Sequence, residues 1–479
     1  MGFGSHKITT NSLEEVLSSK NSLFLQSQNR SMIRKLPLIL FFYGCSFFGQ
    51  HSEYSGSFNL QSNLSFGTEN PFWFHSNQRG RIDEITRFAG WLNGQCRFYN
   101  RSGGFVETGV GLLYSNGYNN RVMLEEYYLT YENDLLKLFA GKEHKEAMYS
   151  GLSATNQNIL WSLNASPISG IGIRMKEPLM LWKQAGIGFK FSYEEYFTDD
   201  ERYIDNTWIH HKSLHLVFKG SERFTLTAGV QHFAQWAGDS DEYGELPSGF
   251  DDYLRVVTGG SIASPEGSLG EQEINGLGNH LGSYEIYLNT SISHFDVELI
   301  YNTIFEDKSG MILRNTPDGR YGIYLRDREE EKWIGAFMYE FFYTKHQSHS
   351  TPTPDGDDNY FNNNLYRSGW TYEGRVLGLP FILLDEERFR IGVNNLMAHH
   401  LGISGLAFSQ FPYKFLTSYR KNYGRKSGTS EPTEEIVSTY LEVQLLNNYF
   451  NFDVLIGGDF NSEEDPILGL GIRLKRVLF

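Results

Sequence analysis

Strand-length segments in which apolar and polar side chains alternate recur along the chain from residue 55 onward. One of them places Phe224, Leu226 and Val230 on the face opposite Thr225 and Thr227. A period of two is that of a β-strand with one apolar and one polar face. No apolar run reaches the roughly 18 residues that a membrane-spanning helix needs, so a bundle of such helices is excluded. The pattern predicts an all-β protein built from two-faced strands.

The last part of the chain shows the alternation most clearly. Residues 437–445 and 450–456 alternate on either side of a short Asn-Asn turn, which predicts a hairpin. Residues 468–475 alternate again, and the chain stops on Phe479. A last strand that ends in an aromatic residue is similar to the assembly signal of outer-membrane barrels.

The connections between the predicted strands separate a membrane barrel from a soluble β-sandwich. The strand pattern alone does not, because an apolar face can pack inward in a sandwich or face lipid in a barrel. Outer-membrane barrels alternate short periplasmic turns with longer extracellular loops, whereas a sandwich has no reason to do so. Short turns are predicted at 100–104, 132–134, 219–223 and 293–294, and long segments at 66–84, 143–167, 195–210, 233–280, 305–318 and 346–368.

The expected fold is a transmembrane antiparallel β-barrel with long extracellular loops. The segments give about nineteen candidate strands, but a bacterial single-chain barrel has an even number, so we expect about 18. The ambiguity lies between residues 369 and 411, where Gly378, Pro380 and a turn at 385–388 leave open whether there is one strand or two. A barrel of this size encloses an aqueous lumen unless loops or helices fill it.

The amino-acid composition restricts the classes of molecule and metal centre that this protein can bind. The net charge of −15 argues against nucleic acid as a partner, because a phosphate backbone requires a basic surface. An aromatic content of 15% suits strands and interfacial aromatic girdles. The two cysteines, Cys45 and Cys96, provide neither a disulfide framework nor a thiolate metal cluster.

The front of the chain has the architecture of a secretory signal. Residues 32–50 combine a basic start, an apolar stretch and a cleavage region near Gly49 and Gln50, so we predict a signal peptide there and a β-barrel over 51–479. Residues 1–31 are interpreted as an over-extended reading frame or a disordered leader. Lipidation at Cys45 is a weaker alternative, because the residues before it do not suit a lipoprotein site. Export of this kind indicates a Gram-negative cell envelope.

Several strings resemble those of the Wzi-like capsule assembly family, and they cover nearly everything after residue 55. The resemblance implies an outer-membrane barrel that binds capsular or exopolysaccharide, acts as a binding protein and helps to assemble or attach the capsule. The strings resemble those of the Bacteroidetes-type branch more than those of the enterobacterial members. Enterobacterial members carry a helical plug at the periplasmic end, and the early start of the first strand here departs from that pattern. The strings are NPFWFHSNQRGRID at 70–83, GLSATNQNILW at 151–161, QHFAQW at 231–236, GLGNHLGSY at 276–284, PDGRYG at 317–322, YTKHQSH at 343–349 and AHHLGI at 398–403.

Two loops carry the residue types that bind glycans, which are aromatic faces for stacking on sugar rings and polar groups for the hydroxyls and uronate carboxylates. For Trp236 and Tyr253, the alternative is a place in the interfacial aromatic girdle. For the first loop, the alternative is a segment folded into the lumen, in which Arg81 and Asp83 pair with each other. The candidates are Trp236, Tyr243, Asp251, Asp252, Tyr253 and Arg255 in one loop, and Trp73, His75, Asn77, Arg81 and Asp83 in the other.

No metal or cofactor is expected. The adjacent pairs His210-His211 and His399-His400 point to opposite faces of a strand and do not chelate one ion together. The acidic residues around Gly356 lack the bidentate glutamate of a calcium loop. Hydrolase and nucleotide motifs are absent from the sequence.

Three functions remain in competition at this stage. The first is a monomeric surface polysaccharide binder that touches outer-membrane lipid. The second is a diffusion porin or glycan channel, suggested by polar inward faces that include Asp296, Glu298, Glu442 and Asp453. The third is an outer-membrane enzyme acting on lipid or glycan, for which the sequence offers no motif.

Overall fold

A computed structural model describes the chain at residues 52–100, 103–119, 121–259, 277–329, 332–348, 358–385, 390–425, 429 and 431–478. The predicted leader, signal peptide and terminal Phe479 lie outside these residues, as do residues 355–357 of the acidic loop. Within the described residues, the search for an apolar helix long enough to cross a membrane finds none.

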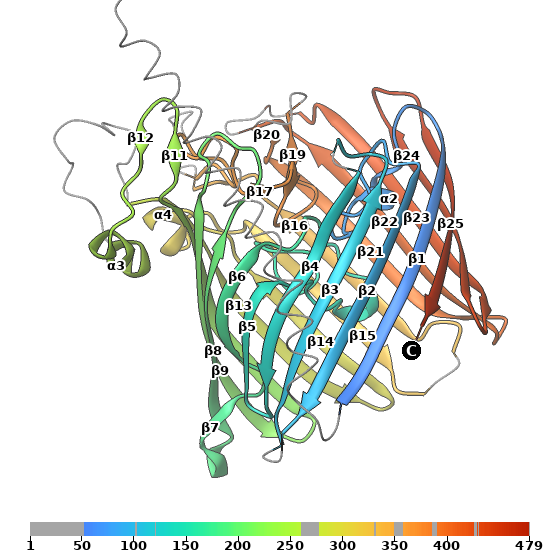
Figure 1. Cartoon of the computed structure of the whole chain (residues 1–479), viewed down its shortest axis with the longest axis horizontal. Coiled ribbons are helices and arrows are strands. Elements are labelled where there is room, and N and C mark those ends of the chain that lie inside the picture. Colours follow the sequence, from blue (N-terminus) through green and yellow to red (C-terminus); the bar gives the residue numbers. More distant parts are fainter. Residues whose placement is uncertain are drawn as a thin grey trace, which may run out of the picture.

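The described strands form one closed antiparallel barrel (Figure 1). The main sheet has 19 strands, of which β7 (Leu179–Trp182) is a short hairpin arm that pairs with β8, so the closed ring has 18. Pairing of the first strand with the last closes the ring. The ring consists of β1 (Ser52–Phe66), β2 (Phe88–Tyr99), β3 (Phe105–Ser115), β4 (Val122–Glu132), β5 (Leu136–Lys142), β6 (Ser169–Met175), β8 (Ile187–Phe197), β9 (Trp208–Ser221), β10 (Phe224–Trp236), β13 (Asn279–Ile292), β14 (Phe295–Asn302), β15 (Gly319–Asp327), β16 (Ala336–Tyr343), β21 (Leu396–Ala407), β22 (Phe411–Asn422), β23 (Glu434–Asn447), β24 (Asn451–Asn461) and β25 (Ile467–Val477).

The loops follow the predicted asymmetry. The four predicted short turns all join strands at one end of the barrel, and the predicted long segments join them at the other. The ambiguous region contributes one barrel strand, β21, because residues 369–385 and 390–395 lie away from the wall and form short hairpins instead. Those hairpins are β17 (Thr371–Tyr372) with β18 (Arg375–Val376), and β19 (Leu383–Leu384) with β20 (Ile391–Val393).

The two faces of the wall have opposite polarity. On β1, Asn59, Gln61 and Asn63 are buried toward the lumen, whereas Leu64 and Phe66 are exposed on the outside. The same alternation leaves apolar side chains exposed around the outer wall. A soluble sandwich would bury these side chains, so the apolar faces meet lipid and the protein is a barrel of the outer membrane, with its long loops extracellular.

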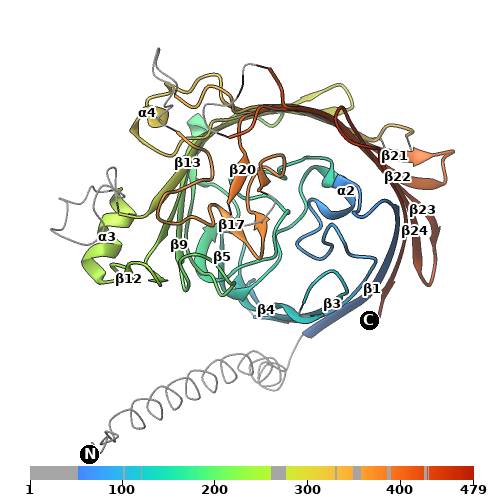
Figure 2. The same ribbon diagram turned by 90° about the horizontal axis from the view of Figure 1, so that it is seen from above.

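Three long loops fold into the lumen and fill it (Figure 2). They are L1 (67–87), which carries α2 (Phe72–His75), L3 (143–168), which carries the short helix η1 (Tyr149–Gly151), and L7, of which residues 344–348, 358–385 and 390–395 are described. Trp73, Phe381 and Trp370 from these loops are among the most deeply buried side chains of the protein. We call the packed loops the plug.

Two further loops lie on the outside of the ring (Figure 2). L5, of which residues 237–259 and 277–278 are described, forms the hairpin of β11 (Asp239–Ser240) and β12 (Gly244–Glu245) and then α3 (Phe250–Thr258). L6 (303–318) contains α4 (Lys308–Met311). On the periplasmic side, η2 (Lys183–Ala185) turns the arm between β7 and β8.

Candidate functional site

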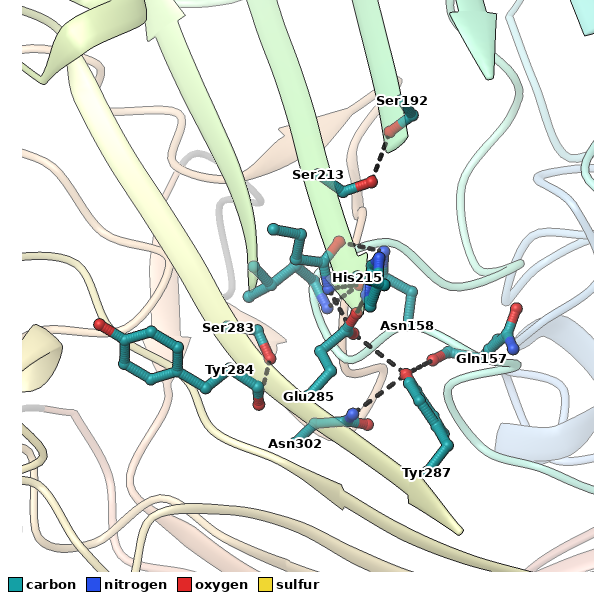
Figure 3. A network of polar contacts seen from close by, with 12 residues as sticks. Gln157, Asn158, Ser192, Ser213, His215, Ser283, Tyr284, Glu285, Tyr287 and Asn302 are labelled. Carbon is teal, nitrogen blue, oxygen red and sulfur yellow. Dashed lines mark hydrogen bonds and ion pairs between the residues drawn. The ribbon is translucent and has the colours of Figure 1, made fainter. Parts of the chain in front are cut away.

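A polar network joins the plug to the inner face of the wall (Figure 3). Asn158 in L3 donates to Gln231 on β10 at 2.6 Å, and Gln231 donates to Glu285 on β13 at 2.7 Å. His215 lies 2.6 Å from the other oxygen of Glu285, and the hydroxyl of Tyr287 lies 3.0 Å from the Gln157 carbonyl. Buried polar groups of a barrel lumen need partners, and here the loop supplies them.

A buried ion pair of the wall, which we call the inner clamp, forms a second set of hydrogen bonds with L3. Arg320 Nε on β15 lies 2.7 Å from Glu340 Oε1 on β16, and both side chains are fully buried. The carboxylate also accepts bonds from Ser153 at 2.8 Å and from the Ala154 amide at 2.7 Å. The guanidinium donates to the Asn156 carbonyl at 3.2 Å. The plug therefore satisfies both charges of the wall.

Carboxyl groups join L6 to L7 by accepting hydrogen bonds from backbone amides and a tyrosine hydroxyl. Glu306 accepts the Asn359 amide at 3.0 Å, Asp358 accepts Ser348 Oγ, and Asp318 accepts Tyr360 Oη at 2.7 Å. Burial raises the pKa of Glu306 to about 8, that of Asp358 to about 7 and that of Asp318 to about 6. This junction therefore holds its protons more tightly than free carboxyls do.

Cavities lie on both sides of the plug. One of about 870 Å³ lies toward the periplasmic ends of the strands, where Arg97, Glu107, Lys414, Glu442 and Arg473 line it. In it the charges pair across strands, with Arg97 on Glu107 at 2.7 Å and Arg473 on Glu442 at 3.2 Å. The other, of about 620 Å³, lies at the extracellular rim between L1, L7 and the upper ends of β22 to β25. We call the second one the rim cleft.

Arg420 on β22 is the candidate ligand-binding residue of the rim cleft. Its guanidinium lies 4.1 Å from the centre of the Phe72 ring, a cation–π contact, and its Nε and Nη1 are buried without a hydrogen-bond partner in the part of the chain that the structure describes. Asp459 on β24 lines the same cleft and accepts the Phe72 amide at 2.8 Å. Buried N–H donors without partners are costly, so a polar ligand that accepts from Arg420 would be favoured.

Arg375 lines the same cleft, but its guanidinium is already bonded to protein groups. It pairs with Asp83 at 3.0 Å and donates to the His75 carbonyl at 3.1 Å and to the Ile82 carbonyl at 2.5 Å. Its role is to hold L1 against L7. Carboxylates outnumber guanidinium groups in the lining, which gives the cleft an acidic character.

The predicted residues of the first loop lie in two different places, the rim cleft and the interior of the plug. His75 and Asp83 line the rim cleft. Trp73 is buried in the plug, where its indole donates to Ser418 at 3.0 Å, and Asn77 donates to the Ala154 carbonyl at 2.6 Å. The loop is folded into the lumen, as in the alternative interpretation, but the pairing of Arg81 with Asp83 that belonged to that alternative is wrong. Each residue pairs with a different segment instead, Arg81 with Glu125 and Asp83 with Arg375, because the wall and L7 offer closer opposite charges.

The predicted residues of L5 lie away from the rim cleft. Trp236 and Tyr253 pack together at 5.4 Å between ring centres, on the outer face of the wall, where a girdle residue would lie. Asp251, Asp252 and Arg255 belong to α3, and Arg255 lies 3.7 Å from Asp252. Tyr243, from the turn between β11 and β12, accepts a weak hydrogen bond from Arg367 at 3.4 Å. A glycan site in this loop stays a prediction.

The histidine pair His210-His211 behaves as strand geometry requires. His210 bonds Glu195 at 2.6 Å beneath Tyr253, whereas His211 stacks on Phe233 in the plug core. Among the described residues, no group of three or more His, Cys, Asp or Glu is placed to hold a metal ion.

Sequence reasoning missed Arg420, Asp459 and Arg375. Arg420 and Asp459 are inward-facing charges near the extracellular ends of predicted strands, and that position was the available signal. Arg375 had no such signal, because it lies in the region whose strand assignment was ambiguous. Its contacts depend on how L7 folds back into the barrel.

Comparison with known proteins shows which family the sequence matches. The family model of capsule assembly protein Wzi matches residues 58–404. Among solved structures, the fold is similar to that of Wzi from Escherichia coli, titled an outer membrane protein involved in group 1 capsule assembly and a carbohydrate-binding β-barrel. The TM-score is 0.58 at 11% identity over 88% of this chain and 83% of that chain.

More distant similarities link the chain to two Pseudomonas aeruginosa proteins. OccK5 (OpdH) gives a TM-score of 0.44 at 8% identity over 89% of this chain and 98% of that chain. OpdQ gives 0.46 at 8% identity over 89% and 97%. At these scores neither similarity carries an argument, and no curated protein matches the sequence. The family model, by contrast, covers most of the barrel, and the chain therefore belongs to the capsule assembly protein Wzi family.

Proposed function

We propose that this outer-membrane barrel binds polysaccharide at the cell surface through the rim cleft and so assists capsule or exopolysaccharide assembly or attachment. The observation that carries the proposal is Arg420, whose buried Nε and Nη1 have no hydrogen-bond partner among the described residues and lie in a cleft at the extracellular rim. Family membership supports the same role. The role is binding, not catalysis, and the working unit is a single barrel, whose main sheet is closed by the pairing of β1 with β25.

The chemistry of the cleft favours a hydroxyl-rich glycan segment. Carboxylates such as Asp385, Glu434 and Asp459 accept hydrogen bonds from sugar hydroxyls, whereas their combined charge repels a densely anionic chain. Arg420 provides one place for a carboxylate or carbonyl of the sugar. The aromatic ring at the site, Phe72, already contacts Arg420 and stacks on Phe381, so recognition in the cleft is mainly polar.

The plug argues against an open diffusion channel. Its polar contacts with the wall are buried, and opening a path would expose the Arg320–Glu340 pair and the Gln231 network. The bonds that L3 makes to these wall groups, such as those from Ser153 and the Ala154 amide to Glu340, would be lost, at about 1 kcal/mol for each hydrogen bond and more for those to charged groups. A barrel closed in this way is suited to holding a ligand at its surface.

The test is saturable binding of isolated capsular polysaccharide from the host to the purified barrel in detergent. Arg420→Met should weaken binding about tenfold or more, the effect of losing a charge-assisted hydrogen bond. Arg326→Met, which alters an exposed arginine near the opposite rim, is the matched control and should bind as the parent does. Heat-modifiable gel mobility reports folding of each variant.

Two outcomes separate the candidate surfaces. If Trp236→Ala with Tyr253→Ala weakens binding while Arg420→Met does not, the glycan binds L5 and the rim cleft is not the site. If the folded parent shows no saturable binding at all, polysaccharide recognition by this chain is excluded.

A further inference from the structure

An outward-facing polar patch interrupts the apolar wall near the extracellular rim. Strand register places Glu195, His210, Ala234 and His280 in one row across β8, β9, β10 and β13. Lys212 and His232 pair in the next row down. The same face of β9 carries the exposed Leu214 and Leu216, so this row faces away from the lumen. Charged groups on the lipid face of a barrel are destabilising, so the patch needs a cover.

Helix α3 provides that cover (Figure 2). Tyr253 donates to Glu195 at 2.6 Å, and Lys212 donates to the Val257 carbonyl near the helix C-terminus. Val256 is completely buried against Trp236 and Ala234. A lysine at the last carbonyls of a helix is also favoured by the helix dipole. The helix is therefore held flat against the outer wall at the upper edge of the apolar belt.

The flank of α3 that the wall does not cover is apolar along one side. Phe250 is 74% exposed and Leu254 45% exposed, and residues four apart lie on the same helix face. Asp251 and Arg255 are exposed on a different face. This division into an apolar and a charged side is typical of helices that lie in a membrane interface.

L6 also presents exposed apolar side chains outside the ring. In L6, Met311, Ile312 and Leu313 are exposed by 50%, 57% and 46%. Tyr284, an outward residue of β13, donates to the Met311 carbonyl at 3.0 Å and so ties this turn to the outer wall. Both loops thus place apolar side chains outside the ring.

We propose that α3 and residues 311–313 form an apolar collar that contacts the acyl chains of the outer leaflet. The collar continues the lipid-facing wall, and its polar attachments are already satisfied by the wall itself. A second copy of the chain is a poorer occupant. Five half-exposed side chains of at most about 200 Å² each offer roughly 500 Å², whereas a stable protein interface buries about 800 Å² per partner.

Site-directed fluorescence in lipid nanodiscs tests the collar. In a Cys96→Ala background, Phe250→Cys, Leu254→Cys and, from the separate loop, Ile312→Cys each receive a polarity-sensitive dye. A nitroxide lipid labelled high on its acyl chain should remove more than about half of the emission, since interfacial helices lie about 5–10 Å deep. Arg255→Cys on the charged side is the matched control and should lose little. The Cys96→Ala parent gives the background labelling.

The remaining outcomes contradict the proposal. Equal quenching by a water-soluble nitroxide on both sides of α3 would mean that the helix stands above the membrane. Shielding of all positions from both quenchers would mean that protein covers the collar. Heat-modifiable mobility confirms that each labelled barrel is folded, and Ile312→Cys keeps the test valid if a substitution in α3 disturbs the helix.

Discussion

L3 and L5 are both long extracellular loops, yet one fills the barrel and the other lies on its outside. L3 meets inward-facing charges on the wall, Arg320, Glu340 and Glu285, directly or through Gln231. L5 meets outward-facing ones, Glu195 and Lys212. In both cases the loop provides the hydrogen-bond partner that the wall lacks. The face on which a wall presents polar groups, and not loop length, decides where a loop folds.

The largest effect should come from breaking the inner clamp. Glu340→Ala leaves Arg320 buried and unpaired, which we expect to destabilise the plug by about 3–5 kcal/mol. Planar-bilayer recordings should then show channel openings that the parent lacks. Asp296→Ala, which breaks an exposed pair with Arg326, should change stability by less than about 1 kcal/mol. A silent Glu340→Ala barrel would show that the clamp is dispensable.

The L6–L7 junction should loosen as pH rises. Glu306, Asp358 and Asp318 have raised pKa values in the folded protein, against about 4 when unfolded. Their contribution is therefore fully present below about pH 4 and is lost as pH rises through about 6, 7 and 8 in turn.

Hydrogen exchange of residues 303–318 and 358–362 measures this loss. Opening should become up to about tenfold easier for each pH unit and each proton released. Glu306→Gln should flatten the upper part of the profile, because that side chain no longer titrates. A profile that is unchanged by this substitution would assign the pH dependence to other groups.

A smaller effect is expected from the network of Figure 3. Gln231→Leu removes the partner of both Asn158 and Glu285, which should cost about 1–3 kcal/mol. Hydrogen exchange should speed up in L3 while L5 amides keep their protection. Equal acceleration in both loops would show that the inner and outer attachments are coupled.

The smallest effect should come from the outer attachment. Tyr253→Phe removes the hydroxyl that bonds Glu195, at a cost of about 0.5–1.5 kcal/mol. Limited proteolysis within L5 should become faster, and bilayer recordings should stay as quiet as those of the parent. Channel openings in this variant would contradict the separation of the two regions.

Much of the fold could be predicted from local sequence because the strand pattern has a strict period. Leu468, Leu470 and Ile472 lie outside as the alternation required, and 18 strands close the ring. The candidate site was predicted less well. His75 and Asp83 reached the rim cleft, whereas Trp73 became part of the plug core, because an aromatic side chain suits a sugar and a buried core equally.

The sequence by itself determined the barrel, its even strand number, the side on which its long loops lie and its family resemblance. These follow from the alternation of polar and apolar residues, from turn spacing and from matching strings. Only the tertiary structure decided that L1, L3 and the described residues of L7 fill the lumen, that Arg81 pairs with Glu125 and that, among the described residues, Arg420 Nε and Nη1 have no partner in the rim cleft. Such pairings join residues far apart in the chain, and their energies depend on burial, which no local pattern records.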